Sequence, residues 1–161
     1  MLCYFVRHGE AEQNQTMHDS ERALTAHGLH QATTAGQFLK MLQKKPELII
    51  SSTLYRAQQT AQEIALLLHV PIEPTDYLLN EVDHNQFIRF LNSKEHSCVV
   101  LVGHQPSLSE IILHLTTNSM QGAIEIKPCT IAAVEIPKPI IPGKGKLAFL
   151  IPQNIIEQFI S

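Results

Sequence analysis

The chain has 161 residues, 44% of them hydrophobic, and a formal net charge of −3. This length and composition predict a single domain over residues 1–161 with one sizeable core. The small negative charge provides no general basic field and argues against nucleic acid as a partner, and no apolar run is long enough to cross a membrane.

Strands and helices are expected to alternate along the chain. Apolar runs predict strands near residues 2–6, 48–51, 98–102, 130–136 and 146–151. Helical periodicity predicts helices near residues 25–42, 54–68, 85–91, 108–115 and 153–160. The segment from Pro137 to Gly145 is rich in Pro, Gly and Lys and predicts a hairpin loop, which makes at least one strand antiparallel. The pattern indicates an α/β protein, a three-layer α/β/α sandwich with a mostly parallel mixed sheet.

The first strand leads directly into Arg7-His8-Gly9-Glu10. A histidine at the carboxyl end of a core strand lies where open α/β sheets place their ligands. Its imidazole can act as a nucleophile, and the preceding arginine offers a planar set of donors that suits phosphate oxygens. The alternative is a chance tetrapeptide with a solvated arginine and a capping histidine.

A second apolar run, 98–102, also ends beside a histidine, in Gly103-His104-Gln105-Pro106. The spacing of Ser107 and Glu110 after it resembles a capping box that opens the next helix. Two separate strands are therefore expected to end in a histidine next to a glycine.

Between these two strands, the strand at 48–51 ends in serines, and Thr53 is the expected cap of a helix that carries Arg56 in its first turn. A cation is unfavourable there because of the helix dipole. We therefore expect Arg56 to face an anion; the alternative is an ordinary solvated arginine.

These segments resemble the histidine phosphatase superfamily, also called the phosphoglycerate mutase-like clan. Arg7-His8-Gly9-Glu10 is similar to its signature, and residues 24–32 are similar to its “Leu-Thr-x-x-Gly-x-x-Gln-Ala” helix opening. Residues 51–61 resemble its second arginine motif, and Gly103-His104 resembles its second histidine motif. Asn14 matches an asparagine that often follows the signature. The resemblance implies a phosphoglycerate mutase-like fold and a phosphatase without cofactor or metal.

The same resemblance assigns expected roles to single residues. It implies that His8 is the catalytic nucleophile and forms a covalent phosphohistidine. Its implied phosphate-binding residues are Arg7, Arg56, His104 and Asn14. The segment Leu79-Asn80-Glu81 resembles the one that bears the proton donor in many members, so Glu81 is a second candidate catalytic residue. The other interpretation of Glu81 is a solvated loop acid.

The chain length and the short interval between Glu81 and His104 resemble the compact SixA-type phosphohistidine phosphatases. Such enzymes act on a phosphorylated histidine of a partner protein and do not generally rely on a glutamate acid. Glu81 therefore favours an alternative, a general phosphomonoesterase acting on small phosphate esters. Less favoured alternatives are a non-catalytic phosphate-binding module and a sugar-phosphate mutase.

The remaining polar residues suggest no further site. The nine histidines include His27 and His30 three residues apart, but no carboxylate or cysteine joins them with zinc-like spacing. The three cysteines are Cys3, Cys98 and Cys129; all fall in strand-like runs and are expected to be buried thiols in a reducing compartment. Since the N-terminus does not resemble a signal peptide, we expect a cytoplasmic protein.

Overall fold

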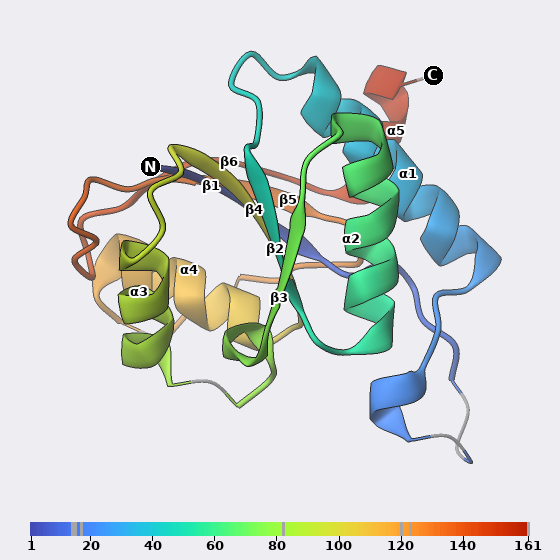
Figure 1. Ribbon diagram of the computed structural model, residues 1–161, viewed down its shortest axis with the longest axis horizontal. Coiled ribbons are helices and arrows are strands. Elements are labelled where there is room, and N and C mark those ends of the chain that lie inside the picture. The colour runs from blue at the N-terminus through green and yellow to red at the C-terminus, as the bar shows by residue number, and fades with distance from the viewer. Residues whose placement is uncertain (14–15, 17, 82, 120, 123, 161) are drawn as a thin grey trace.

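The protein is described by a computed structural model that covers residues 1–13, 16, 18–81, 83–119, 121–122 and 124–160 (Figure 1). A six-stranded sheet in the order β3-β2-β4-β1-β5-β6 forms its centre. The strands are β1 (Leu2–Arg7), β2 (Leu48–Ser52), β3 (Ile72–Thr75), β4 (Cys98–Gly103), β5 (Ile131–Glu135) and β6 (Lys146–Ile151). The first four in this numbering are parallel, and β5 is antiparallel to both β1 and β6. The mostly parallel mixed sheet and its hairpin are confirmed.

Helices cover both faces of the sheet (Figure 1). One face carries α1 (Ala26–Met41), α2 (Tyr55–Leu68) and α5 (Gln153–Ile160), and the other carries α3 (His84–Asn92) and α4 (Ser107–Thr117). Two short 3-10 helices, η1 (Asp19–Glu21) and η2 (Asp76–Leu78), lie in the connections. The α/β/α sandwich is therefore confirmed.

The two cores follow from the alternation of side chains along β1. Tyr4 and Val6 point into the core beneath α1 and α2, whereas Cys3 and Phe5 point into the core beneath α4. Because both faces of this central strand are buried, it has a continuous apolar sequence rather than an alternating one.

Three local expectations are wrong. Strand β3 was not expected, because it has only four residues and contains Pro74, which a sheet tolerates at an edge strand. Ser107 does not cap α4: Leu108 N donates to His104 O (2.9 Å), so the backbone satisfies this turn. Thr53 does not cap α2, because its hydroxyl donates to Asp76 Oδ1 (2.6 Å) instead.

The three cysteines are buried free thiols. Cys3 and Cys98 lie in strands as expected, but Cys129 precedes β5 in a turn with a positive φ of 51°. Burial raises the pKa of Cys3 to about 12. In the part of the chain that the structure describes, no helix has the length and apolar character needed to span a bilayer.

Candidate active site

The two motif histidines meet at the carboxyl edge of the sheet. Arg7 and Gly103 are paired in the parallel ladder between β1 and β4, so the residues that follow them, His8 and His104, emerge side by side. Their ring centroids are 5.0 Å apart, and the side chains are 8% and 1% exposed. The sheet register thus brings together two histidines that are 96 positions apart in the sequence.

Hydrogen bonds define the orientation of the His8 ring. Arg56 Nε donates to His8 Nε2 at 3.2 Å, and His8 Nδ1 lies 2.7 Å from Gly9 O. Because a guanidinium can only donate and a carbonyl can only accept, Nδ1 carries the proton and Nε2 carries the lone pair. Burial, opposed by the hydrogen bond to Gly9 and reinforced by the charges of Arg56 and Arg7, lowers the pKa of His8 to about 4. His8 is therefore neutral at pH 7, and its Nε2 lone pair can act as a nucleophile once the hydrogen bond from Arg56 is released.

His104 is held from β2. Its Nε2 lies 2.7 Å from Ser52 Oγ, the last residue of that strand. Ser52 Oγ also accepts from Leu54 N (3.4 Å), and a hydroxyl can both donate and accept, so these contacts fix the position of the His104 ring but not its tautomer. Burial lowers the pKa of His104 to about 3, with help from the charges of His8 and Arg56. His104 Nδ1 is buried and has no hydrogen-bond partner among the described residues.

Two arginines add positive charge next to these rings. Arg56 is the second residue of α2, and its side chain is 4% exposed. Its NH1 and NH2 groups donate to the backbone oxygen and a carboxylate oxygen of Asp19 (2.6 and 3.0 Å). The expectation that Arg56 faces an anion is thus met by a residue of the chain itself.

Arg7 donates through NH1 to Ile126 O at 2.9 Å, and its Nε has no partner among the described residues. Burial, followed by the positive charge of Arg56, lowers the pKa of Arg7. A guanidinium remains charged in proteins. The site therefore holds two partly desolvated cations close enough to affect each other, which is an arrangement suited to an anion with several oxygens.

The helix-opening motif supports the loop that carries His8. Gly28 and Gly9 are in close backbone contact: a Cβ on Gly28 would lie 2.0 Å from Glu10 O, and one on Gly9 would lie 2.5 Å from Gly28 O. Glu10 N donates to Gln31 Oε1 (2.8 Å), and Thr25 N donates to Glu10 O (3.0 Å). The residues of this motif thus hold the backbone that follows the nucleophile.

The second arginine motif contributes a further support. Thr60 Oγ1 accepts from Gly9 N (3.1 Å) and donates to Arg56 O (2.8 Å), so α2 is bound directly to the loop after His8. This connects the two motifs and fixes Arg56 relative to His8.

The structure does not bring Glu81 into this cluster, and Asn14 lies outside the described residues. Glu81 is exposed, in the loop between η2 and α3, and no hydrogen bond or ion pair joins it to another described residue. Within the described ranges, no group of three or more His, Cys, Asp or Glu side chains could hold a metal ion.

Sequence reasoning overlooked Asp19 and Arg22. Asp19 bridges two arginines, with Oδ1 on Arg22 NH1 (2.9 Å) and Oδ2 on Arg56 NH2 (3.0 Å). The only available signal was an aspartate and an arginine three residues apart just before the Leu24-Thr25 motif. Ser52 was noticed as the end of a strand, but not as a partner of His104.

Known proteins share this sequence pattern and this fold. The model of the histidine phosphatase superfamily (branch 1) matches residues 3–88. A phosphohistidine phosphatase SixA homolog of Haemophilus influenzae is 27% identical over 147 residues, which cover 82% of this chain and 86% of that protein. An uncharacterized protein of Picosynechococcus sp. is 34% identical over 116 residues, covering 68% of this chain and 70% of its own length.

Solved structures agree in fold. The protein histidine phosphatase SixA complexed with tungstate superposes with a TM-score of 0.85 at 22% identity, covering 96% of this chain and 98% of that one. A putative alpha-ribazole-5'-P phosphatase of Escherichia coli gives 0.78 at 21% identity, with coverage of 96% and 98%. With the family model spanning more than half of the sequence and the motif histidines adjacent in space, the chain belongs to the histidine phosphatase superfamily.

Proposed function

We propose that this phosphatase hydrolyses phosphohistidine on a partner protein through a covalent intermediate on His8. The observation that carries the proposal is the state of the His8 ring: it is neutral, with Nδ1–H bound to Gly9 O and the lone pair of Nε2 beside the Arg56 guanidinium. A nucleophile next to a fixed cation is the pair that attack on an anionic phosphoryl group requires.

In the first step, Arg56 Nε–H releases the lone pair of His8 Nε2, which attacks phosphorus and forms an N–P bond while the bond to the leaving group breaks. The leaving group takes the bonding electrons and must gain a proton. In the second step, water attacks phosphorus, the N–P bond breaks, and inorganic phosphate and neutral His8 are released. The hydrogen bond from His8 Nδ1 to Gly9 O stabilises the positive charge that the ring acquires while it is phosphorylated.

Arg56, Arg7 and His104 bind the phosphoryl oxygens in this proposal. Arg56 and Arg7 retain unused N–H donors, and His104 offers the partnerless Nδ1. Such preorganised donors stabilise charge that develops in the transition state, and loss of one typically costs ~10²–10³ in rate. Asn14 stays a predicted phosphate ligand.

The exposure of Glu81, together with the chemistry of the leaving group, supports phosphohistidine as the substrate class. An imidazole leaves readily once protonated, so its departure needs little help from an enzyme acid, whereas an alkoxide needs a proton donor. Glu81 is exposed and has no hydrogen bond or ion pair with the residues that the structure describes, which fits an enzyme that does not depend on it. The similarity to a SixA homolog over most of both chains supports the same substrate class.

One observation favours the alternative, a general phosphomonoesterase. Leu78, three residues before Glu81, has its backbone oxygen 3.3 Å from where a Cβ on Gly103 would lie. The segment that bears Glu81 thus starts next to Gly103, the residue that precedes His104. Glu81 could act as the acid for an alkoxide leaving group from such a position.

A panel of three substrates, assayed with the wild type and Glu81→Gln, separates the two functions. The proposal predicts that a phosphohistidine-bearing protein domain is preferred over phosphoserine and p-nitrophenyl phosphate, and that Glu81→Gln slows its hydrolysis by less than about threefold. A strong preference for alkyl phosphates, reduced ~10²-fold or more by Glu81→Gln, would establish the phosphomonoesterase instead.

A further inference from the structure

Arg56 is held by one residue, Asp19, through its backbone oxygen and one carboxylate oxygen. Its Nε donates to His8 Nε2 (3.2 Å), its NH1 to Asp19 O (2.6 Å) and its NH2 to Asp19 Oδ2 (3.0 Å). A guanidinium is a rigid plane, so fixing both terminal nitrogens also fixes the direction of the Nε–H bond. We propose that Asp19 is a positioning residue for catalysis: it orients Arg56, and through Arg56 the nucleophile His8. The inference rests on the proposed function.

Asp19 connects the buried site to the protein surface. Its side chain is 60% exposed, whereas the Arg56 side chain that it binds is 4% exposed. Its other oxygen accepts from Arg22 NH1, and Arg22 Nε donates to Glu12 O (2.7 Å). The hydrogen bond from Arg22, assisted by Arg56, lowers the pKa of Asp19, so the carboxylate stays ionised at neutral pH. One negative charge therefore bridges two cations, and η1, which carries it, is bound to the loop after β1.

The carboxylate leaves room for a phosphoryl group on Arg56. A guanidinium has five N–H donors, and the contacts to His8 and Asp19 use three. One donor on each terminal nitrogen remains for phosphoryl oxygens. Asp19 can therefore stay bound to Arg56 while the remaining donors bind a phosphoryl group.

This arrangement predicts opposite effects on binding and on turnover. Removal of the Asp19 charge makes the electrostatic potential around Arg56 more positive, which favours binding of a phosphate dianion. Asp19→Ala also removes the hydrogen bond to Arg56 NH2 and leaves the backbone bond to NH1, so the guanidinium can pivot about that bond. Misplacement of a catalytic group by about 1 Å can cost ~10²-fold in rate. Asp19→Ala should therefore lower kcat by ~10–100-fold without raising the inhibition constant for inorganic phosphate. Asp19→Asn keeps an acceptor oxygen for Arg56 and should recover most of the kcat.

Glu21→Ala is the matched control, because Glu21 lies in the same 3-10 helix and is exposed. It removes the same charge but no bond to Arg56, and its kcat should stay within about twofold of wild type, as expected for a surface site. If η1 has a purely structural role, kcat should fall to a similar extent in Asp19→Ala and in Glu21→Ala. The NMR signal of Arg56 Nε–H should stay sharp in Glu21→Ala and broaden in Asp19→Ala.

A double-mutant cycle gives the decisive test. If Asp19 acts through Arg56, then Asp19→Ala should reduce kcat by less than twofold in an Arg56→Ala background, since contacting groups are not additive. Equal losses in both backgrounds, or wild-type kcat in Asp19→Ala, would overturn the positioning role. If Arg56→Ala itself retains full turnover, Arg56 takes no part in the reaction. That result contradicts the proposed function and is distinct from a failure of the positioning role of Asp19.

Discussion

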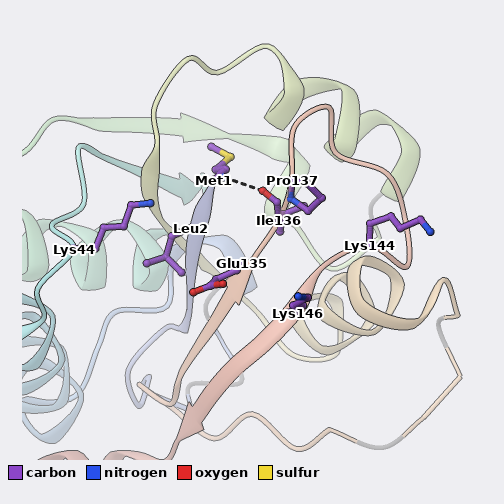
Figure 2. A pocket seen from close by; sticks show the side chains of 8 residues that line it. All are labelled: Met1, Leu2, Lys44, Glu135, Ile136, Pro137, Lys144 and Lys146. Atoms are coloured by element: carbon purple, nitrogen blue, oxygen red, sulfur yellow. Dashed lines mark hydrogen bonds between the residues drawn. The ribbon is translucent and has the colours of Figure 1, made fainter.

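Positive charge gathers at both edges of the central sheet, but in different physical forms. At the carboxyl edge, Arg56 is buried, and hydrogen bonds to His8 and Asp19 fix its guanidinium. At the opposite edge, three exposed lysines, Lys44, Lys144 and Lys146, surround a cavity of about 480 Å³ beside Met1 (Figure 2). No ion pair fixes these lysines among the described residues.

The difference shows what turns a positive region into a reactive one. A lysine ammonium on a flexible, hydrated stem can attract an anion, but it does not fix the anion's oxygens. At the carboxyl edge, burial has already removed water from the cations and from His8, which keeps the imidazole neutral. The cavity at the opposite edge has lysines among its lining residues but no nucleophile comparable to His8.

The largest effect should come from the nucleophile. His8→Ala removes the only atom proposed to form a covalent bond to phosphorus, and we expect turnover of any phosphorylated substrate to fall ~10⁴-fold or more, as for other nucleophile deletions. Lys146→Ala, at the opposite edge, should leave turnover unchanged. Steady-state kinetics on purified variants with unaltered circular dichroism checks this, and near-normal turnover in His8→Ala would exclude the mechanism.

The next effect should come from the fixed cation. Arg56→Ala removes donors to the phosphoryl oxygens and the hydrogen bond to His8 Nε2, so kcat/KM should fall ~10²–10³-fold. Arg56→Lys should recover little of it, because an ammonium cannot reproduce the planar set of donors. Lys144→Ala provides the exposed-cation comparison. If Arg56→Ala and Lys144→Ala reduce kcat/KM equally, the cations at the two edges of the sheet do not differ as we describe.

A smaller effect tests how the backbone orders the carboxyl edge. A Cβ on Gly28 would lie 2.0 Å from Glu10 O, a backbone atom that can move only with the His8 loop. Gly28→Ala should lower the free energy of unfolding by ~1–3 kcal/mol and reduce activity. At Gly36 the nearest atom, at 2.7 Å, is the end of the Leu67 side chain, which can rotate away. Urea denaturation should therefore show a smaller loss for Gly36→Ala; the reverse order would refute the close-contact explanation.

The smallest effect concerns pH. The pKa of His8 is lowered from 6.5 to about 4, so a decrease from pH 7 to pH 5 should leave the imidazole mostly neutral. An unshifted histidine would be mostly protonated at pH 5, since its ordinary pKa is ~6.5. NMR titration of the His8 ring should therefore show its midpoint near pH 4. A midpoint near 6.5 would mean that burial and the arginines do not control the nucleophile.

Much of the architecture could be predicted because the central strands are buried on both faces. Continuous apolar runs identified β1, β2 and β4, and the residue after β1 and after β4 is the histidine of each motif. Short β3 carries Pro74 and has little apolar pattern, so it becomes a strand only by pairing with β2.

The contacts that tune the site could not be read from local patterns. Asp19 and Arg56 are 37 residues apart, and nothing near Asp19 in the sequence indicates that its carboxylate reaches a buried guanidinium. The partnership of Ser52 with His104 likewise depends on the order β2-β4-β1, which topology decides. The role of Glu81 stays a prediction, because its side chain is exposed and has no hydrogen bond or ion pair with another described residue.

The most direct test of the central claim is to trap the intermediate. Rapid quench of the wild type with a substrate labelled in its phosphoryl group, followed by peptide mapping, should find phosphate on His8 that is labile to acid and stable to alkali. The label should be absent from His8→Ala and still present in Lys146→Ala. Label on another residue, or turnover without any protein-bound phosphate on the quench timescale, would contradict the account.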